Sequence, residues 1–219
     1  MDVHLSDGSE TACVFWLHGL GDTPHGWADM ARTMKPKMKH IKWILPHAPE
    51  HPVTCNAGYE STSWMDLLEI PIKVNSPDNG LQQEESIQKI HELIEKEISS
   101  GISSERIVLG GFSQGAALAL ASSLKFDKKL GGCVVFSGWA LPHQQLGKIL
   151  DTSINKEMPF MVAHGKEDNV VLTENGIFVS NLLKQANAHV NFHLYDGMPH
   201  SSCPEEINDL VAFLKETLP

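Results

Sequence analysis

Several features are scarce or missing in this chain of 219 residues, and each absence excludes a class of protein. The four cysteines form no C-x-x-C pair and no zinc-ligand spacing, which argues against a disulfide scaffold and a structural zinc site. No apolar run approaches the roughly 20 residues that a membrane-spanning helix needs. No secretion signal, myristoylation motif or prenylation box is visible. We therefore expect a cytoplasmic protein without a stable membrane anchor.

Positive charge is also scarce. Lysine and arginine number 17 against 27 for aspartate and glutamate, so the formal net charge is −10. Polyphosphate and anionic lipid repel a protein of this sign, and we expect no nucleic-acid partner. The 42% of hydrophobic and 20% of charged residues are nevertheless typical of a globular protein. The length suits one domain with a sizeable core, so we predict a single domain over residues 1–219.

Short β-branched or aromatic runs alternate with amphipathic stretches, which is typical of α/β proteins. Several runs are apolar on both faces, such as I-V-L at residues 107–109, and this favours inner parallel strands covered by helices. The predicted strands are Cys13–Leu17, Ile41–Leu45, Ile107–Gly111, Cys133–Ser137, Phe160–Ala163 and Val190–Tyr195. We therefore predict an α/β fold with a mostly parallel central sheet and helices on both faces.

Helices are predicted where apolar residues recur at the helical period. They cover residues 81–100, residues 114–125, residues 173–188 with Thr173 as N-cap, and the end of the chain from Pro204. Residues 46–80 contain five prolines and show no clear period. Because long irregular excursions between strands are often functional, we predict that this segment is a loop insertion at the mouth of a site.

The most informative motif is G-F-S-Q-G at residues 111–115, which matches G-x-S-x-G between a predicted strand and a predicted helix. In that context the serine lies in a strained turn that exposes its hydroxyl, and the glycines allow strand and helix to approach closely. The N–H of Gln114 lies at the helix start, where unpaired donors and the helix dipole favour negative charge. We predict Ser113 as a nucleophile and the Gln114 N–H as an oxyanion donor.

A serine nucleophile needs a base and an acid that orients it, and in this architecture they follow in the order serine, acid, histidine. Asp168 and His200 each come just after a predicted strand. Because the carboxyl ends of parallel strands share one sheet edge, both side chains can meet Ser113 there. We predict Asp168 as the acid and His200 as the base, with Glu167 and Asp196 as rival acids. The rate should then fall as a histidine with a pKa of about 6.5 becomes protonated.

A second oxyanion donor is expected from the loop that follows an earlier strand. The segment W-L-H-G-L-G-D at residues 16–22 has an apolar strand followed by glycines that let the backbone turn inward. The N–H of Leu20 is the predicted donor. We expect His18 to fix this loop by a hydrogen bond and not to bind a metal. The chemistry requires no metal and no cofactor.

These motifs give the chain a specific resemblance to a known family. The segment H-G-L-G-D-T-P-H-G-W at residues 18–27 resembles the corresponding motif of the acyl-protein thioesterases, cytosolic α/β-hydrolases also described as lysophospholipases or small carboxylesterases. Further matches are P-H-A-P at 46–49, P-V-T at 52–54, S-W-M-D at 63–66, residues 110–115 and residues 197–202. The resemblance covers nearly the whole chain. It implies an α/β-hydrolase fold with Ser113, Asp168 and His200 as catalytic triad and Leu20 and Gln114 as oxyanion donors.

The chain departs from the family pattern at several positions. Ala116 stands where a second glycine is usual, Asn169 stands where the family commonly has proline, and Pro24 and Pro199 stand where glycine is frequent. The acid itself is kept. The departures therefore bear more on substrate preference than on the chemistry.

The resemblance also implies a flexible flap that lines an acyl-chain channel. Candidate substrate-binding residues on this flap are Trp64, Leu67 and Leu68, and Trp139 follows another strand end and is a further candidate. The alternative for each side chain is packing in the core.

The leading hypothesis is a serine hydrolase that cleaves acyl thioesters or esters through an acyl-enzyme, with palmitoylated proteins or lysophospholipids as substrates. Two alternatives stay open, a short-chain carboxylesterase without protein substrates and a non-catalytic binder of acyl groups or lipids. Binding alone requires no aligned acid and base, which favours an enzyme. We expect a monomer or a weak homodimer.

Overall fold

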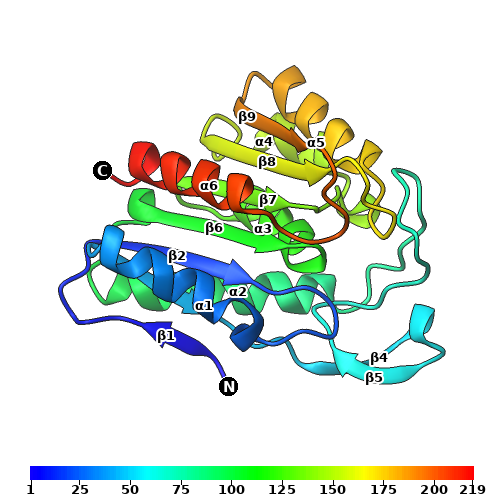
Figure 1. Ribbon diagram of the computed structural model, residues 1–219, viewed down its shortest axis with the longest axis horizontal. Helices are drawn as coiled ribbons and strands as arrows, with labels where there is room; N and C mark the ends of the chain where they lie inside the picture. The colour runs from blue at the N-terminus through cyan, green and yellow to red at the C-terminus, as the bar shows by residue number, and fades with distance from the viewer.

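A mostly parallel sheet forms the centre of the molecule (Figure 1). The computed structural model describes residues 1–219, with the side chain of residue 143 left out. The strands of this sheet are β1 (Val3–Leu5), β2 (Ala12–Leu17), β3 (Ile41–Leu45), β6 (Ile107–Phe112), β7 (Gly132–Phe136), β8 (Pro159–Gly165) and β9 (His189–Tyr195). Their order is β1-β3-β2-β6-β7-β8-β9, and among the described strands of this sheet only β1 runs antiparallel to its neighbour.

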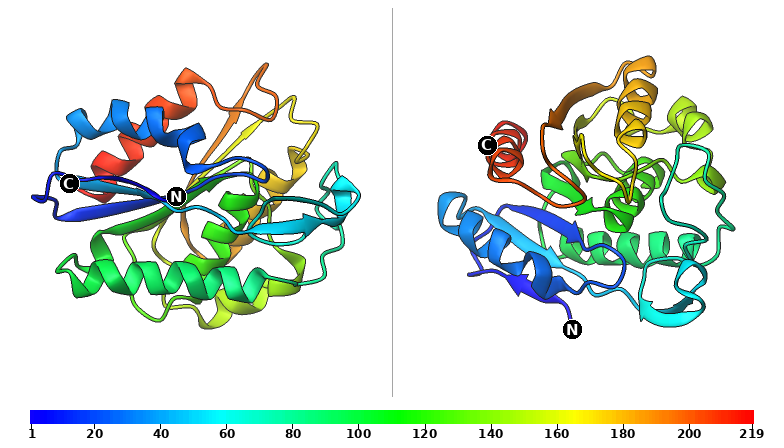
Figure 2. Two further views of the ribbon diagram at one scale, coloured as in Figure 1. Left: turned by 90° about the horizontal axis from the view of Figure 1, so that it is seen from below. Right: turned by 45° about the vertical axis from the view of Figure 1, so that its right-hand side comes forward.

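Helices cover both faces of this sheet. They are α1 (Pro24–Met34), α2 (Gln83–Ser99), α3 (Gln114–Lys125), α4 (Leu146–Thr152), α5 (Glu174–Gln185) and α6 (Pro204–Thr217). Figure 2 shows α1 and α6 together on one face, with α2 and α3 on the other. None of the helices in the described part of the chain is long and apolar enough to cross a membrane.

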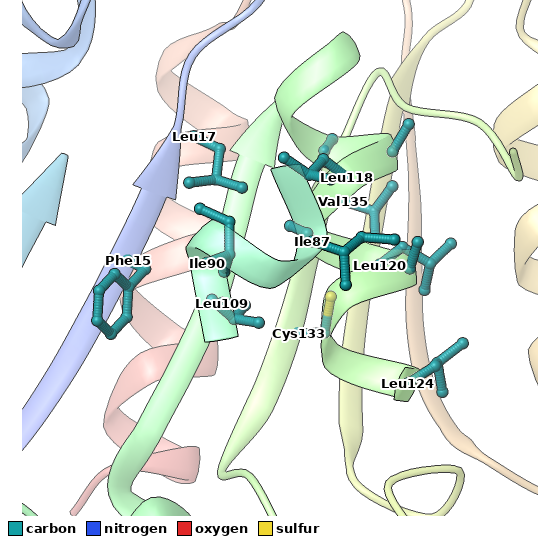
Figure 3. Close-up of a cluster of buried hydrophobic side chains, with 14 of the residues drawn as sticks. Phe15, Leu17, Ile87, Ile90, Leu109, Leu118, Leu120, Leu124, Cys133 and Val135 are labelled. Atoms are coloured by element: carbon teal, nitrogen blue, oxygen red, sulfur yellow. The ribbon is translucent and has the colours of Figure 1, made fainter. Parts of the chain in front are cut away.

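Each face of the sheet has its own hydrophobic core, and the alternation of strand side chains supplies both. In β2, Phe15 and Leu17 join the cluster beneath α2 and α3, whereas Val14 and Trp16 join the cluster beneath α1 and α6. Figure 3 shows the first cluster, in which side chains of β2, β6 and β7 meet those of α2 and α3. Burial on both faces fixes the carboxyl ends of the inner strands, where the site lies.

The predicted strands and helices are present, with ends that differ by a few residues. Thr173 is the N-cap residue of α5 as predicted, but its hydroxyl donates to the Gly165 carbonyl instead of capping the helix. β1, α1 and α4 are not predicted by the sequence pattern. β1 and α4 have only three and seven residues, too few to show a period. The buried face of α1 is formed largely by small side chains, which weakens its apolar pattern.

The segment of residues 46–80 is more regular than the sequence predicts. It contains an antiparallel hairpin of β4 (Glu50–Val53) and β5 (Tyr59–Thr62). Pro52 lies in β4 opposite Glu60, which is tolerated because each strand of a two-stranded ribbon has one unpaired edge. Beyond the hairpin the chain passes the carboxyl ends of the strands, and Ile72 forms a parallel bridge with Val171 (Figure 1).

Helix α6 carries a buried carboxyl group. Glu206 is fully buried, and neither of its carboxyl oxygens has a hydrogen-bond partner among the described residues. Burial, with a smaller contribution from the Asp209 carboxylate, raises the pKa of Glu206 from 4.5 to about 9. The folded protein therefore holds a proton at neutral pH that the unfolded chain releases.

The Glu206→Gln variant is expected to be more stable than the wild type at neutral pH. Because the folded pKa of Glu206 lies near 9 and the unfolded value near 4.5, the stability of the wild type falls as pH rises between these values, by about 1.4 kcal/mol per pH unit. Glutamine does not ionise, so the free energy of unfolding of the variant should exceed that of the wild type by about 3 kcal/mol at pH 7 and by under about 1 kcal/mol at pH 5. Urea denaturation of both proteins at pH 7 and pH 5 measures this difference in stability. The same difference at the two pH values would contradict the prediction.

Candidate active site

Ser113 lies in the turn between β6 and α3, at the carboxyl edge of the sheet. Its φ of 55° and ψ of −122° fall in a region that residues other than glycine rarely adopt, so the turn is strained. The Ser113 N–H donates to the Phe136 carbonyl at 2.8 Å, and the Ser113 carbonyl accepts from Ala117 at 3.1 Å to start α3. The chain therefore reverses sharply at the serine, as the motif predicts.

Gly115 allows α3 to begin this close to β2. A Cβ on this residue would lie 2.2 Å from the Leu17 carbonyl oxygen and 2.5 Å from that of His18. We expect Gly115→Ala to lose about 3 kcal/mol of stability or to fail to fold, because backbone atoms block the methyl group. Gly147→Ala in α4 is the matched control, since a Cβ there contacts only Leu182 Cδ1, at 3.9 Å. Thermal denaturation compares them, and equal melting temperatures would contradict the prediction.

Two further side chains reach Ser113 from the loops that follow β8 and β9. His200 Nε2 lies 2.9 Å from Ser113 Oγ, and His200 Nδ1 lies 2.7 Å from Asp168 Oδ2. The two loops are joined by a hydrogen bond from the Glu167 N–H to the Met198 carbonyl at 3.1 Å. The three residues predicted as a triad thus form one hydrogen-bonded chain.

The Asp168 carboxylate is buried and accepts hydrogen bonds at both oxygens. Oδ1 accepts from the N–H groups of Val170 and Val171, each at 2.9 Å, and Oδ2 lies 3.3 Å from His164 Nε2 as well as close to His200. Burial by itself would raise the pKa of Asp168, but the hydrogen bonds from His164, His200 and Val170 hold it well below 3.8. Asp168 is therefore ionised at neutral pH and can hold a proton on His200 Nδ1.

The two rival acids both lie at the surface. Asp196 pairs with Lys166 at 2.6 Å on the surface, and Glu167 is exposed. His193 Nδ1 faces Asp209 Oδ2 at 3.2 Å. Among the described residues, no group of three or more histidine, cysteine, aspartate or glutamate side chains is placed to hold a metal ion.

The glycine loop after β2 lies directly against Ser113. A Cβ on Gly19 would be 3.4 Å from Ser113 Cβ, and Leu20 and Gln114 line the same cavity as Ser113. The Gln114 N–H is the first of α3 and has no partner within the helix. No described residue accepts a hydrogen bond from the Leu20 N–H. The structure therefore brings both predicted donors, with free N–H groups, to the cavity at the serine.

An apolar cavity of about 190 Å³ opens beside Ser113. Leu67 and Trp139, both predicted to bind substrate, line it together with Ile70, Ile72 and Val170. Ile70 is 47% exposed, so it lies at the lip of the cavity. The Ser113 side chain and these apolar side chains therefore line the same cavity.

The other two predicted substrate-binding residues lie elsewhere. Trp64 is fully buried and is not part of the cavity wall. Its indole N–H donates to the His18 carbonyl at 2.9 Å, and the two rings pack with centroids 5.3 Å apart. Leu68 is half-buried and does not line the cavity either. Both predictions relied on the family resemblance and on apolar character, and neither says whether a given side chain faces a cavity or the core.

Two further residues contribute to this site and were not predicted from the sequence. His164 contacts Asp168, and the Phe112 ring packs on the His200 ring with centroids 4.7 Å apart. The H-G-x-x-D segment at residues 164–168 was a signal for the first, because it places a histidine and the acid at the end of one strand. Phe112, inside the G-x-S-x-G motif, carried no comparable signal.

The chain is similar to known proteins over almost its whole length. A family model described as phospholipase/carboxylesterase matches residues 1–218. Acyl-protein thioesterase 1 from Gibberella zeae is 41% identical over 217 residues, which cover 95% of this chain and 92% of that protein. A probable carboxylesterase from Arabidopsis thaliana described as SOBER1-like is 36% identical, with 97% and 81% covered.

Solved structures show the same fold. Arabidopsis thaliana SOBER1 superposes with a TM-score of 0.87 at 34% identity, covering 95% of this chain and 99% of that one. Acyl-protein thioesterase 2 from Zea mays has a TM-score of 0.87 at 28% identity, covering 100% and 99%. With a family model that spans the chain and relatives well above 30% identity, this protein belongs to the phospholipase/carboxylesterase family and has the α/β-hydrolase fold.

Proposed function

We propose that this protein is a serine hydrolase that cleaves acyl thioesters or esters through an acyl-enzyme. The observation that carries the proposal is the hydrogen-bonded chain from Ser113 through His200 to Asp168, next to an apolar cavity. Membership of the phospholipase/carboxylesterase family, and relatives named as a thioesterase and a carboxylesterase, support the same activity.

In the proposed mechanism Ser113 attacks the acyl carbonyl while His200 Nε2 accepts the proton of the hydroxyl. Asp168 holds the proton on Nδ1 and stabilises the imidazolium that forms. The N–H groups of Leu20 and Gln114 donate to the oxygen of the tetrahedral intermediate. His200 then protonates the leaving thiol or alcohol, and the acyl group stays on Ser113. Water, deprotonated by His200, releases the acid by the same steps.

The acyl chain of the substrate is assigned to the apolar cavity. The segment of residues 46–80 supplies three of the residues that line this cavity, Leu67, Ile70 and Ile72. We therefore infer that this segment is a loop insertion at the mouth of the site. An apolar pocket beside the reacting serine suits a substrate whose acyl group is removed from water while the rest stays outside. Palmitoylated proteins and lysophospholipids both have this form.

Leu67→Trp is expected to distinguish substrates by their acyl length. The larger ring fills part of a cavity of about 190 Å³, so a long acyl chain no longer fits in the cavity, whereas an acetyl group still does. We expect kcat/KM for an octanoyl p-nitrophenyl ester to fall about 10- to 100-fold, and that for the acetyl ester to fall less than about threefold. An equal loss on both esters would contradict the assignment of the acyl chain to this cavity.

The small size of a hollow next to the cavity favours a second candidate, a carboxylesterase of short acyl esters. This hollow shares Leu67, Ile72 and Trp139 with the cavity and has a volume of only about 10 Å³. Hydrolysis of p-nitrophenyl butyrate, p-nitrophenyl palmitate and an S-palmitoylated peptide separates the two functions. Comparable rates on the two palmitoyl substrates favour the thioesterase, and butyrate turnover alone favours the short-chain esterase.

Labelling with a fluorophosphonate probe tests the proposal itself. Such a probe phosphonylates a serine only when a base and an oxyanion site activate it. We expect one modified residue, and mass spectrometry should locate the label on Ser113. A folded protein that stays unlabelled would overturn the proposal and favour a non-catalytic binder of acyl groups or lipids.

We also propose that the protein works in the cytoplasm, as a monomer or weak homodimer. All four cysteines carry free thiols in the described structure, and Cys13 and Cys133 are buried. Free thiols are typical of a reducing compartment. Analytical ultracentrifugation at micromolar concentration measures the oligomeric state.

A further inference from the structure

A network of buried side chains connects the two predicted oxyanion donors, which lie on different elements. Leu20 belongs to the loop after β2, and Gln114 begins α3. The side chains between them are those of His18, Trp64 and Gln114, and none of these residues is more than 1% exposed. The proposed chemistry uses the backbone of Gln114 but gives no role to these three side chains.

The His18 ring is held at both nitrogens. Nδ1 lies 2.8 Å from the Gly19 carbonyl oxygen, and Nε2 lies 3.1 Å from the Ala48 nitrogen. A carbonyl accepts and an amide donates, so these partners require a neutral ring with its proton on Nδ1. Burial favours the same state, because it lowers the pKa of His18 from 6.5. The ring thus donates to Gly19 and accepts from Ala48.

The Gly19 carbonyl belongs to the same peptide group as the Leu20 N–H. In a planar trans peptide the C=O and N–H bonds point in opposite directions. The carbonyl accepts from His18 Nδ1 at 2.8 Å and, at the longer distance of 3.2 Å, from the Asp22 N–H. Because these donors hold the carbonyl, the Leu20 N–H points away from the ring, and Gly19 and Leu20 both line the cavity at Ser113. Rotation of this peptide would remove a donor from the oxyanion site and turn a carbonyl oxygen toward it.

Trp64 connects His18 to the second donor. Its indole N–H donates to the His18 carbonyl at 2.9 Å, and its backbone N–H donates to Gln114 Oε1 at 2.8 Å. Gln114 Nε2 in turn donates to the Met65 carbonyl at 2.9 Å. The residue that supplies the second N–H is therefore anchored by its own side chain to the segment that holds His18.

We propose that His18 is a positioning residue for the oxyanion site: its ring fixes the Gly19–Leu20 peptide with the Leu20 N–H facing the cavity, and Trp64 holds that peptide in register with Gln114. The inference rests on the proposed function, since an oxyanion forms only if Ser113 attacks a carbonyl. Loss of the ring should therefore reduce transition-state stabilisation and leave substrate binding in place.

Two variants separate the donor of the ring from its acceptor. In His18→Asn the amide NH₂ can replace Nδ1–H and still donate to Gly19. In His18→Gln the amide reaches the position of Nε2 and retains only the contact with Ala48. We expect His18→Gln to lower kcat for p-nitrophenyl butyrate about 10²- to 10³-fold, with KM and the pH dependence of kcat nearly unchanged. His18→Asn should stay within about tenfold of the wild type, and the exposed His4→Gln in β1 is the control.

Equal losses of kcat in the two variants, an unchanged kcat in His18→Gln, or a loss that matches a fall in melting temperature would each overturn the proposal. If His18→Gln does not fold, Trp64→Phe takes its place, because it removes the indole N–H that donates to the His18 carbonyl and keeps an aromatic ring at this buried position. That variant should lower kcat about fivefold at constant KM, and an unchanged kcat would overturn the proposal. Failure of the proposed function can be distinguished from failure of the His18 proposal. In the first case the wild type itself would show no hydrolysis that depends on Ser113.

Discussion

Ser113→Ala is expected to lower kcat for p-nitrophenyl butyrate by about 10⁴- to 10⁶-fold. The change removes Oγ, the atom on which the acyl-enzyme forms, and leaves His200 and Asp168 in place at their 2.7 Å contact. The Leu20 and Gln114 donors also remain, so a small residual acceleration over water is expected from them. Initial rates with and without the variant enzyme, at equal protein concentration, measure the effect.

Ser122→Ala is the matched control for this loss. Ser122 lies in the same helix that follows Ser113, is fully buried, and its hydroxyl has no hydrogen-bond partner among the described residues. The same atom is removed from the same residue type, yet kcat should stay within about twofold because no reacting group is touched. Ser113→Ala activity within about tenfold of the wild type would defeat the assignment of the nucleophile.

The parts of the fold and site that the sequence predicts are those with a local cause. The apolar run of residues 107–109 predicts an inner strand, and the G-x-S-x-G context predicts the sharp turn at Ser113. Asp168 and His200 follow because parallel strands bring their carboxyl ends to one edge, whatever the details of packing. Local sequence motifs, combined with the rule that parallel strands end at one sheet edge, were therefore enough to predict that Ser113, Asp168 and His200 lie together.

The parts that could not be predicted depend on partners far away in the chain. Trp64 lies in a segment without a period, and its indole donates to a carbonyl 46 positions earlier. Glu206 is predicted at a helix start, where acids are usually exposed, but it is fully buried. In both cases tertiary packing sets the direction of the side chain, and the local sequence pattern does not indicate that direction.

One departure from the family pattern has a structural explanation in a neighbouring strand end. Ala116 replaces a usual glycine, and its methyl group lies where a Cβ on Gly138 would be only 2.8 Å away. The missing side chain of Gly138 therefore leaves room for that of Ala116. Asn169 is exposed, and nothing in the structure explains its difference from the family pattern.

Asp168→Asn is expected to lower kcat by about 10⁴-fold, the loss known for this change in serine proteases, with little effect on KM. The N–H groups of Val170 and Val171 donate to Oδ1 at 2.9 Å, so in the variant they select the amide oxygen for that position. The amide NH₂ must then occupy the Oδ2 position, which faces His200 Nδ1 at 2.7 Å. Two N–H donors cannot form a hydrogen bond, so His200 has to move its proton to Nε2.

With its proton on Nε2, His200 cannot accept the proton of the Ser113 hydroxyl 2.9 Å away, although the geometry is almost unchanged. Asp196→Asn is the control, because that carboxylate pairs with Lys166 on the surface and should leave kcat within about twofold. Fluorophosphonate labelling gives a second measurement: the Asp168 variant should label slowly at Ser113, whereas Ser113→Ala should not label at all. Retention of a tenth or more of wild-type kcat by Asp168→Asn would mean that the carboxylate does not set the tautomer of the base, and the orienting acid would then have to be another group.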